Sequence, residues 1–463
     1  MAPLVLGIDS STQSTKALLV DAETGQVLEE RRSSHPDGTE VDPRAWLRAV
    51  DEAAGPLLER ADALAVGGQQ HGMVLLDEAG EVVRPALLWN DTRSADAATT
   101  LIDEMGGPQA SVEEIGSLMV ASFTASKLRW VRDEEPENAQ RAAQVLLPHD
   151  FVSLHLAESG TAPFTDRGDA SGTGYYSTRE EAWKPELVEA ALGKNLELPR
   201  LPSAPNEVMA RTASGAAIAA GTGDNMGAAL GLSLGPGDVS VSIGTSGVCA
   251  MVSDARPGDA SGTVTGFADA TGRFLPMTTT INASRILEAG RALLGVSHDE
   301  MAELALASEP GANGVTLLPY FDGERTPNRP HARATLTGMS TSTTREDVAR
   351  AYVEALLCSL ADGITSLEER TGTAARRITL IGGGARSRAV QQLAPAIFGR
   401  EVTIAPDGEF VALGAARQAA WALAGTEEPP SWEISGSRVV TADATPEVLG
   451  AYRELKERTA DWS

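Results

Sequence analysis

Two stretches far apart in the sequence share one plan: an apolar strand, a turn of glycine and small hydroxyl residues, and a second apolar strand. The first is GIDSSTQSTKALLVD at residues 7–21, and the second is VSVSIGTSGVCAMV at residues 239–252. A repeated strand-turn-strand unit at the start of each half indicates internal duplication, although two unrelated hairpins could also look alike. We therefore expect two halves of similar architecture.

Strands and helices alternate in both halves. LVLGID, STKALLVD and QVLEERR are expected strands, PRAWLRAVDEAAGPLLERA is an expected helix, and ALAVGG returns to strand. Later, ITLIGGGARSRAVQQLAPAIFG predicts strand, glycine turn and helix, EVTIAP another strand, and GEFVALGAARQAAWALAG the last helix. This alternation predicts an α/β layer architecture. GLSLGPGD is the best candidate linker, so the expected domains are residues 1–234 and 235–463.

The charge balance limits the partners. A formal net charge of −26 over 463 residues argues against nucleic acid and anionic membrane surfaces, which need clustered Lys and Arg. No apolar run approaches the roughly 20 residues that cross a bilayer, MAPLVLGID meets an acid before a secretory apolar region could form, and two cysteines are too few for a disulfide framework. We expect a cytoplasmic protein.

Three turns could handle phosphate without net positive charge. They are DSSTQSTK, SIGTSG and IGGGARS, the last ending in Ser387. Each exposes consecutive N–H groups and hydroxyls, the arrangement that cradles phosphate oxygens. One such turn alone is usually only a turn, but three together predict a nucleotide site. The P-loop and dinucleotide fingerprints are both absent from the strand-to-helix turns.

Two acids stand at positions suited to chemistry. Asp9 ends an apolar strand beside hydroxyls, where it could hold a hard cation or simply cap a turn. Asp224, followed by Asn225, precedes a small-residue run that can start a helix. It could be a helix N-cap, or it could accept a proton from an alcohol that attacks phosphorus.

Two polar clusters could read a sugar. GGQQHG places Gln69, Gln70 and His71 between glycines, and LWNDTR supplies Trp89 and Asp91 at another strand end. Hydrogen-bonding side chains beside an apolar ring suit a polyol, although polar loop surface is an equal alternative. The histidines show no metal-ligand spacing.

Taken in order, the motifs resemble the FGGY carbohydrate kinases. They run from GIDSSTQSTK through GGQQHG, LWNDTR, FTASKLRW, LLPHDF, TDRGDASGT, GTGDN, SIGTSG, LPYFDGERTP and IGGGARS to ALGAARQA and cover most of the chain. The resemblance implies two ribonuclease-H-like domains of the actin, Hsp70 and sugar kinase superfamily, with ATP and sugar in an interdomain cleft.

The resemblance also implies roles. Asp224 would be the general base, Asp9 would organise Mg²⁺, and His71, Gln70 and Asn225 would contact the sugar. The implied ATP contacts are Ser11, Thr12, Gln13, Ser14 and Lys16 in the first phosphate loop, Gly244, Thr245 and Ser246 in the second, and Gly383 and Gly384 in the adenosine loop. The sequence departs from the family pattern in three places. Many relatives carry Gly where Ser11 stands, and many bacterial relatives carry Met where Gln70 stands. Near Glu288, some relatives carry an aromatic residue that contacts the adenine.

The implied reaction is transfer of the γ-phosphoryl group of ATP to the C5 hydroxyl of D-xylulose. Ribulose, gluconate, L-xylulose or a related polyol remains an alternative substrate, because sugar specificity depends on a few hydrogen bonds. The alternative outside the enzymes is an actin-like or regulatory sugar-binding protein that binds ATP without phosphorylating a substrate. A homodimer is one option for an assembly state that the sequence leaves open.

Overall fold

The computed structural model describes residues 2–462, which form two compact units. Unit 1 comprises Met1–Leu234, Asp254–Leu275 and Gly408–Glu433, and unit 2 comprises Gly235–Ser253, Pro276–Asp407 and Ile434–Ser463. The first exchange between the units falls inside GLSLGPGD. Division of the sequence into family domains at residues 1–234 and 235–463 remains a proposal.

Unit 1 is built on a mixed sheet. The strands of its main sheet run in the order β11-β12-β5-β1-β2-β3, and β13 also pairs with β5. β1 is antiparallel to β2 but parallel to β5, and β12 and β13 are also parallel to β5. The bounds of these strands are β1 (Leu4–Ser10), β2 (Ser14–Asp21), β3 (Val27–Ser34), β5 (Ala63–Gly68), β11 (Val208–Arg211), β12 (Ala217–Ala219) and β13 (Thr222–Gly223).

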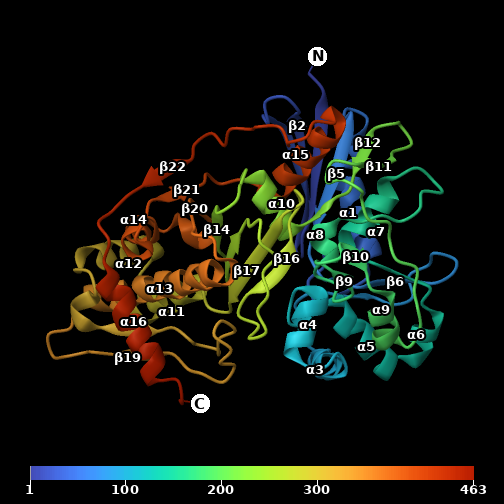
Figure 1. Ribbon diagram of the computed structural model, residues 1–463. Helices are drawn as coiled ribbons and strands as arrows, with labels where there is room; N and C mark the ends of the chain where they lie inside the picture. Colours follow the sequence, from blue (N-terminus) through green and yellow to red (C-terminus); the bar gives the residue numbers. More distant parts are fainter. Residues whose placement is uncertain (1, 463) are drawn as a thin grey trace. The chain divides into compact units, whose positions relative to one another are not determined.

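Helices cover both faces of this sheet (Figure 1). The helices of unit 1 are α1 (Arg44–Ala53), α2 (Gly55–Leu58), α3 (Ala95–Glu104), α4 (Pro108–Ile115), α5 (Thr124–Glu134), α6 (Pro136–Arg141), α7 (Pro148–Leu156), α8 (Arg167–Ala170), α9 (Pro185–Leu192), α10 (Asp224–Gly231) and α15 (Phe410–Ala424). Its shorter strands are β4 (Glu40–Val41), β6 (Val74–Leu76), β7 (Ala86–Leu87), β8 (Gln144–Leu146), β9 (Tyr176–Ser177), β10 (Ala182–Trp183) and β16 (Thr265–Ala268).

The core of unit 1 follows the two-residue period of its strands. Leu6 and Ile8 of β1 belong to one buried cluster, which includes Trp46 of α1, whereas Val5 belongs to a second cluster with the alanines of α15. Successive side chains of a strand point to opposite faces, so one apolar strand serves both clusters. At Gly7 a Cβ atom would lie 1.9 Å from the Ala412 carbonyl oxygen, so only glycine admits α15 this closely.

Unit 2 repeats the strand plan. Its sheet contains the order β17-β15-β14-β20-β21-β22, with β14 antiparallel to β15 and parallel to β20. The strands are β14 (Val239–Ile243), β15 (Gly247–Met251), β17 (Phe274–Thr280), β18 (Thr316–Leu318), β19 (Thr335–Thr337), β20 (Ile378–Ile381), β21 (Val402–Ile404) and β22 (Arg438–Val440). An antiparallel pair followed by a parallel neighbour therefore occurs in both units, as duplication predicts.

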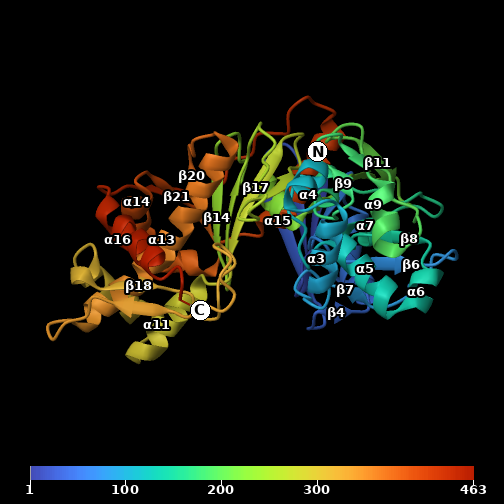
Figure 2. The same ribbon diagram turned by 60° about the horizontal axis from the view of Figure 1, so that its bottom comes forward.

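A long helix organises the rest of unit 2 (Figure 2). α13 (Arg345–Thr371) begins at a capping box between Thr344 and Asp347 and makes its most extensive contacts with three other helices. These are α11 (Ser284–Leu294), α12 (His298–Ala307) and α14 (Arg388–Phe398). The expectation that residues 408–425 hold the last helix is wrong, because α16 (Pro446–Arg458) follows and buries Val448, Tyr452 and Leu455.

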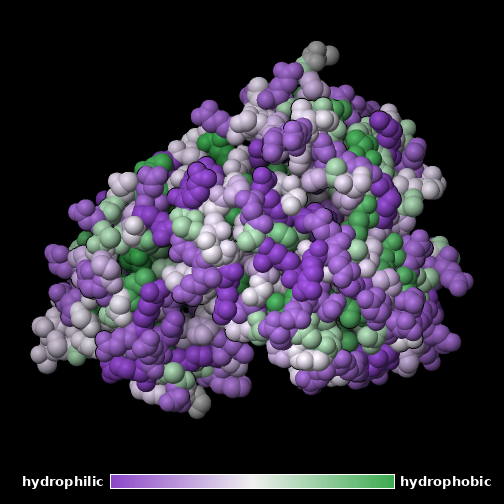
Figure 3. Space-filling model, viewed as in Figure 1, coloured by the Kyte–Doolittle hydropathy of each residue, from purple (hydrophilic) through white to green (hydrophobic). Residues whose placement is uncertain are grey.

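The visible surface is mostly hydrophilic (Figure 3), as the large negative charge would suggest. Both cysteines are buried and free. Among the helices of residues 2–462, none has the length and apolar character required to cross a membrane.

Candidate active site

Three parallel strands of unit 1 end at one edge of its sheet. In the register of the pairs, Asp9 of β1 lies beside Gly67 of β5, and Gly223 of β13 lies beside Gly68. The residues that follow these strand ends are therefore neighbours in space, although the sequence separates them widely. This edge brings together Asp9, the turn at residues 10–13, the loop at residues 69–71, and Asp224.

Asp224 is the first residue of α10, and Gly223 is the N-cap. The reading of Asp224 as an N-cap is therefore wrong. One oxygen of its carboxylate, Oδ1, accepts hydrogen bonds from the Asn225 backbone N–H at 2.7 Å and from Asn225 Nδ2 at 2.8 Å. Loss of solvation and the negative charge of Asp9 raise the pKa of Asp224 to about 7. A carboxylate with this pKa can accept a proton near neutral pH.

Asp9 is almost completely buried. Its carboxylate accepts a short hydrogen bond from the Ser11 hydroxyl and faces Lys16 Nζ at 3.4 Å. Burial raises the pKa of Asp9, while Lys16 and Ser11 act in the opposite direction. Lys16 also forms a 2.6 Å ion pair with Glu409, which directly precedes α15. Sequence reasoning missed Glu409, since it lies 393 residues from its partner.

The turn after β1 is pinned by side chains. His35 bridges it, with Nε2 2.8 Å from Thr15 Oγ1 and Nδ1 2.8 Å from the Ser11 carbonyl oxygen. Trp89 donates its indole N–H to Thr12 Oγ1 at 2.9 Å. Gln13 is exposed and Ser14 is buried. His35 and Trp89, which lie outside the turn, thus both hold the predicted first phosphate loop by hydrogen bonds.

The loop after β5 carries the predicted sugar contacts. Gln69 is 1% exposed, and neither polar atom of its side-chain amide has a hydrogen-bond partner among the described residues. Gln70 Oε1 accepts a hydrogen bond from Asn225 Nδ2 at 3.0 Å. His71 adopts a left-handed backbone conformation with φ 66°. A buried amide without a protein partner fits a site that receives a polar ligand or water.

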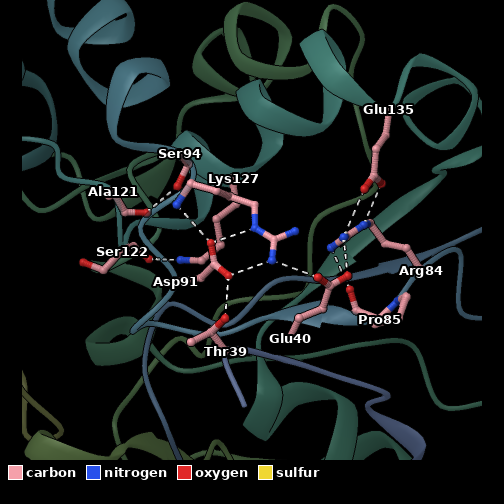
Figure 4. A network of polar contacts seen from close by, with 11 residues as sticks. Thr39, Glu40, Arg84, Pro85, Asp91, Ser94, Ala121, Ser122, Lys127 and Glu135 are labelled. Carbon is pink, nitrogen blue, oxygen red and sulfur yellow. Dashed lines mark hydrogen bonds and ion pairs between the residues drawn. The ribbon is translucent and has the colours of Figure 1, made fainter.

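Asp91, unlike Gln69, is surrounded by hydrogen-bond donors of the protein (Figure 4). Its two oxygens accept hydrogen bonds from the Arg93 backbone and guanidinium and from Thr39 Oγ1, at 2.8 to 3.0 Å. The lone pairs of the carboxylate are therefore already used. A direct contact of Asp91 with sugar stays a prediction, as does that of Trp89.

A buried polar cluster of His149 and three aspartates packs next to this edge of the sheet. His149 Nδ1 is 2.9 Å from Asp169, and the carboxylates of Asp150 and Asp166 lie within 3.7 Å of Nε2. Burial disfavours the charged imidazole, but the carboxylates outweigh it and raise the pKa of His149 to about 10. A Cβ atom on Gly68 would come 2.9 Å from His149 Cβ, so the cluster packs directly against the start of the sugar loop.

In unit 2, the second hydroxyl turn and the glycine turn line one pocket. Its volume is about 650 Å³, and Gly244, Thr245, Gly383, Gly384 and Ser387 are among its lining residues. Ser246, the other predicted contact in this turn, adjoins β15 and is not among them. Among the described lining residues, His298 carries the only aromatic ring. Its Nε2 lies 3.4 Å from a carboxylate oxygen of Glu288. Glu288 marks the region where the resemblance implies that an aromatic residue of some relatives is missing.

No cluster of three or more acidic, histidine or cysteine side chains able to hold a metal ion occurs in residues 2–462. Mg²⁺ commonly binds one or two carboxylates together with water and substrate phosphates. Asp9 offers the carboxylate, and the neighbouring Ser10 hydroxyl is buried without a hydrogen-bond partner in the described chain. The residues present therefore fit the predicted metal.

Known protein families and curated relatives match nearly the whole chain. The N-terminal domain of the FGGY family of carbohydrate kinases matches residues 4–232, and the C-terminal domain matches residues 239–423. Xylulose kinase of Streptomyces coelicolor is 44% identical over 440 residues, which cover 92% of this chain and 89% of the relative. Xylulose kinase of Streptomyces rubiginosus is 42% identical over 459 residues, covering 95% and 93%.

The crystal structure of xylulose kinase from Bifidobacterium adolescentis superposes with a TM-score of 0.92 at 46% identity, covering 98% of this chain and 99% of that one. These similarities confirm the predicted α/β fold with two ribonuclease-H-like domains, and they identify the protein as a phosphotransferase that acts on a sugar. The chain belongs to the FGGY family of carbohydrate kinases.

Proposed function

We propose that this carbohydrate kinase transfers the γ-phosphoryl group of ATP to the C5 hydroxyl of D-xylulose, with Asp224 as the general base. The observation that carries the proposal is the environment of Asp224, whose pKa of about 7 suits proton acceptance at the strand edge that also holds Asp9 and the sugar loop. The name xylulose kinase of relatives at 42% and 44% identity supports the choice of sugar.

In this mechanism Asn225 orients the base. Its backbone N–H and its side-chain amide both hold Asp224 Oδ1, which leaves Oδ2 to take the proton from the attacking hydroxyl. The proton needs to leave as the new O–P bond forms, since the oxygen would otherwise carry positive charge. Gln69, Gln70 and His71 would orient the sugar so that its terminal hydroxyl meets the base.

The phosphates would be held by the two hydroxyl turns and Lys16. Backbone N–H groups and hydroxyls of residues 10–15 in unit 1, and those of residues 244–246 in unit 2, can donate hydrogen bonds to phosphate oxygens without a net positive surface. Asp9 would hold Mg²⁺, which supplies positive charge to the phosphate oxygens during transfer. The pocket of unit 2, with Gly383, Gly384 and Ser387, would receive the adenosine.

A sugar panel tests the proposal. ADP release by the purified protein is measured with D-xylulose, ribulose, L-xylulose, gluconate and no sugar. We expect kcat/KM for D-xylulose to exceed that of the others by about tenfold or more, because a site that pairs hydroxyls rejects wrongly placed ones. A higher value for another sugar would replace D-xylulose as the substrate. ADP release that does not depend on any sugar would contradict the kinase mechanism.

The Asp224→Ala variant tests the base. Turnover should fall on the order of 10²-fold or more, the low end of general-base effects. Asn206→Ala, at a partly exposed position of the same unit, is the matched control. Turnover by folded Asp224→Ala protein near that of the control would remove Asp224 from the mechanism.

A further inference from the structure

Lys127 is a completely buried lysine on α5. Its Nζ donates to two backbone carbonyl oxygens, that of His71 at 3.2 Å and that of Ser122 through a shorter contact. Figure 4 shows the contact with Ser122. The first carbonyl belongs to the predicted sugar loop, and the second directly precedes Phe123. One amine therefore holds two segments that are about 50 residues apart in the sequence.

The side chains of His71 and Phe123, one from each segment, are neighbouring rings that are tilted relative to each other. The imidazole of His71 lies 5.0 Å from the ring of Phe123 and 5.6 Å from that of Phe267, measured between ring centroids. His71 Nδ1 is 2.7 Å from the Gly172 carbonyl oxygen. A carbonyl oxygen can only accept, so Nδ1 carries the proton and a neutral ring has its acceptor at Nε2. The orientation of Nε2 thus depends on where the His71 backbone is fixed.

That backbone is in a conformation that needs external support. The φ of 66° at His71 is left-handed, which costs a residue other than glycine about 1 kcal/mol or more. Lys127 Nζ and, at 3.3 Å, Thr124 Oγ1 both donate to its carbonyl oxygen, and both residues lie on α5. Helix α5 therefore helps to set the position of the sugar loop through this carbonyl oxygen, in addition to the contact of the imidazole with Gly172.

The choice of a lysine at this position has a cost. Burial lowers the pKa of Lys127 to about 7, against the effect of the negative charge of Asp91. Asp91 is itself held by Arg93 and Thr39, at the edge of the ion-pair network in Figure 4. A methionine would fill similar space without this desolvation cost. The distinctive contribution of the amine is therefore its two carbonyl contacts, which a neutral amine with two N–H bonds can still make.

We propose that Lys127 is a positioning residue of the sugar site, which fixes the left-handed backbone of His71 and the neighbouring ring of Phe123 so that the imidazole meets the sugar in one orientation. The inference rests on the proposed function only in taking His71 as a sugar contact. It predicts that Lys127 contributes to sugar binding without contributing to ATP binding.

The test compares Lys127→Met with Arg129→Met, a matched control on the same helix. Arg129 bonds Glu104 and Asp133 instead of the sugar loop, so both variants replace a long basic side chain of α5 with methionine, and only one of them removes a contact to the sugar loop. KM values for D-xylulose and ATP are measured separately, sugar binding is measured by calorimetry without ATP, and unfolding midpoints are recorded. We expect Lys127→Met to raise the sugar KM and Kd about tenfold, the effect of losing a buried hydrogen-bond donor to the His71 carbonyl, with an ATP KM within about twofold of wild type. Arg129→Met should change neither KM.

The Thr124→Val variant keeps the test decisive if Lys127→Met does not fold. It removes the other donor to the same carbonyl and should raise the sugar KM about threefold, because this neutral bond is longer. An unchanged sugar Kd in a folded variant, or equal rises in both KM values, would overturn the inference. Failure of the proposed function is seen separately, as lack of activity of the wild-type protein on D-xylulose. The same comparison is then made with the sugar that the panel identifies.

Discussion

Trp89 donates its indole N–H to the Thr12 hydroxyl at 2.9 Å and thereby joins a predicted sugar contact to the predicted first phosphate loop within one unit. The indole is 46% exposed, so a ligand can reach it while the hydrogen bond holds the loop. The same contact gives the loop a partner outside its own turn. A change at Trp89 should therefore be felt by both substrates.

Trp89→Phe keeps a ring and removes the hydrogen bond. A neutral hydrogen bond contributes about 1 kcal/mol, so the KM for ATP should rise about three- to fivefold, together with a comparable rise for the sugar. Steady-state kinetics with each substrate varied in turn checks this. Trp462→Phe, at an exposed tryptophan of unit 2, is the control. An effect on the sugar alone would show that the Thr12 contact is not used.

The pH dependence of kcat/KM should report the base. Only ionised Asp224 accepts a proton, and its pKa is about 7 because burial and the charge of Asp9 oppose ionisation. kcat/KM should therefore be half-maximal near pH 7, level off about one pH unit above it, and approach a tenfold fall per pH unit at about one unit below it, since kcat/KM follows the ionisation of the free enzyme. A profile that stays flat down to pH 5 would assign the proton to another group.

The same shift predicts a stability effect. The folded-state pKa of Asp224, about 7, lies above its ordinary value of 3.8, so the folded state binds the proton more tightly. This residue therefore costs stability increasingly as pH rises from about 4 to 7. Asp224→Asn should raise the unfolding midpoint more at pH 8 than at pH 4, as measured by calorimetry. An equal change at both pH values would contradict the shift.

Lys16 is shared between Asp9 and Glu409. A phosphate that engages Lys16 competes with the 2.6 Å pair to Glu409, which is partly exposed. Because such pairs are worth about 1 kcal/mol or less, Glu409→Gln should lower the KM for ATP about two- to fivefold. Glu427→Gln removes the same charge at an exposed position of the same unit. Equal effects of the two variants would point to net charge instead of the release of Lys16.

The sequence predicts the strand frame because apolar period and turn chemistry are local. β1, β2, β5, β14, β15, β20 and β21 all fall on segments expected to be strands. It could not predict that α15 packs on β1, since Gly7 and Ala412 meet only after the chain has passed through unit 2. The support of the site was missed for the same reason. Lys127, His149 and Glu409 each have a partner that is distant in the sequence, His71, Asp169 and Lys16 respectively, and no local signal marks these pairs.

The last prediction concerns Gln70, whose Oε1 accepts a hydrogen bond from the same Asn225 amide that holds Asp224. Gln70→Met, the residue of many bacterial relatives, removes one acceptor from Asn225 while leaving its contacts to Asp224. A neutral hydrogen bond of this kind contributes about 1 kcal/mol, so kcat with D-xylulose should fall no more than about fivefold. The sugar ranking should change more than kcat, because Gln70 is itself a predicted sugar contact. The sugar panel repeated with this variant checks both, and Gln109→Met, at an exposed position of unit 1, is the control. A fall in kcat as large as that of Asp224→Ala would be too large for the loss of one hydrogen bond to Asn225. It would instead give Gln70 a part in holding the base.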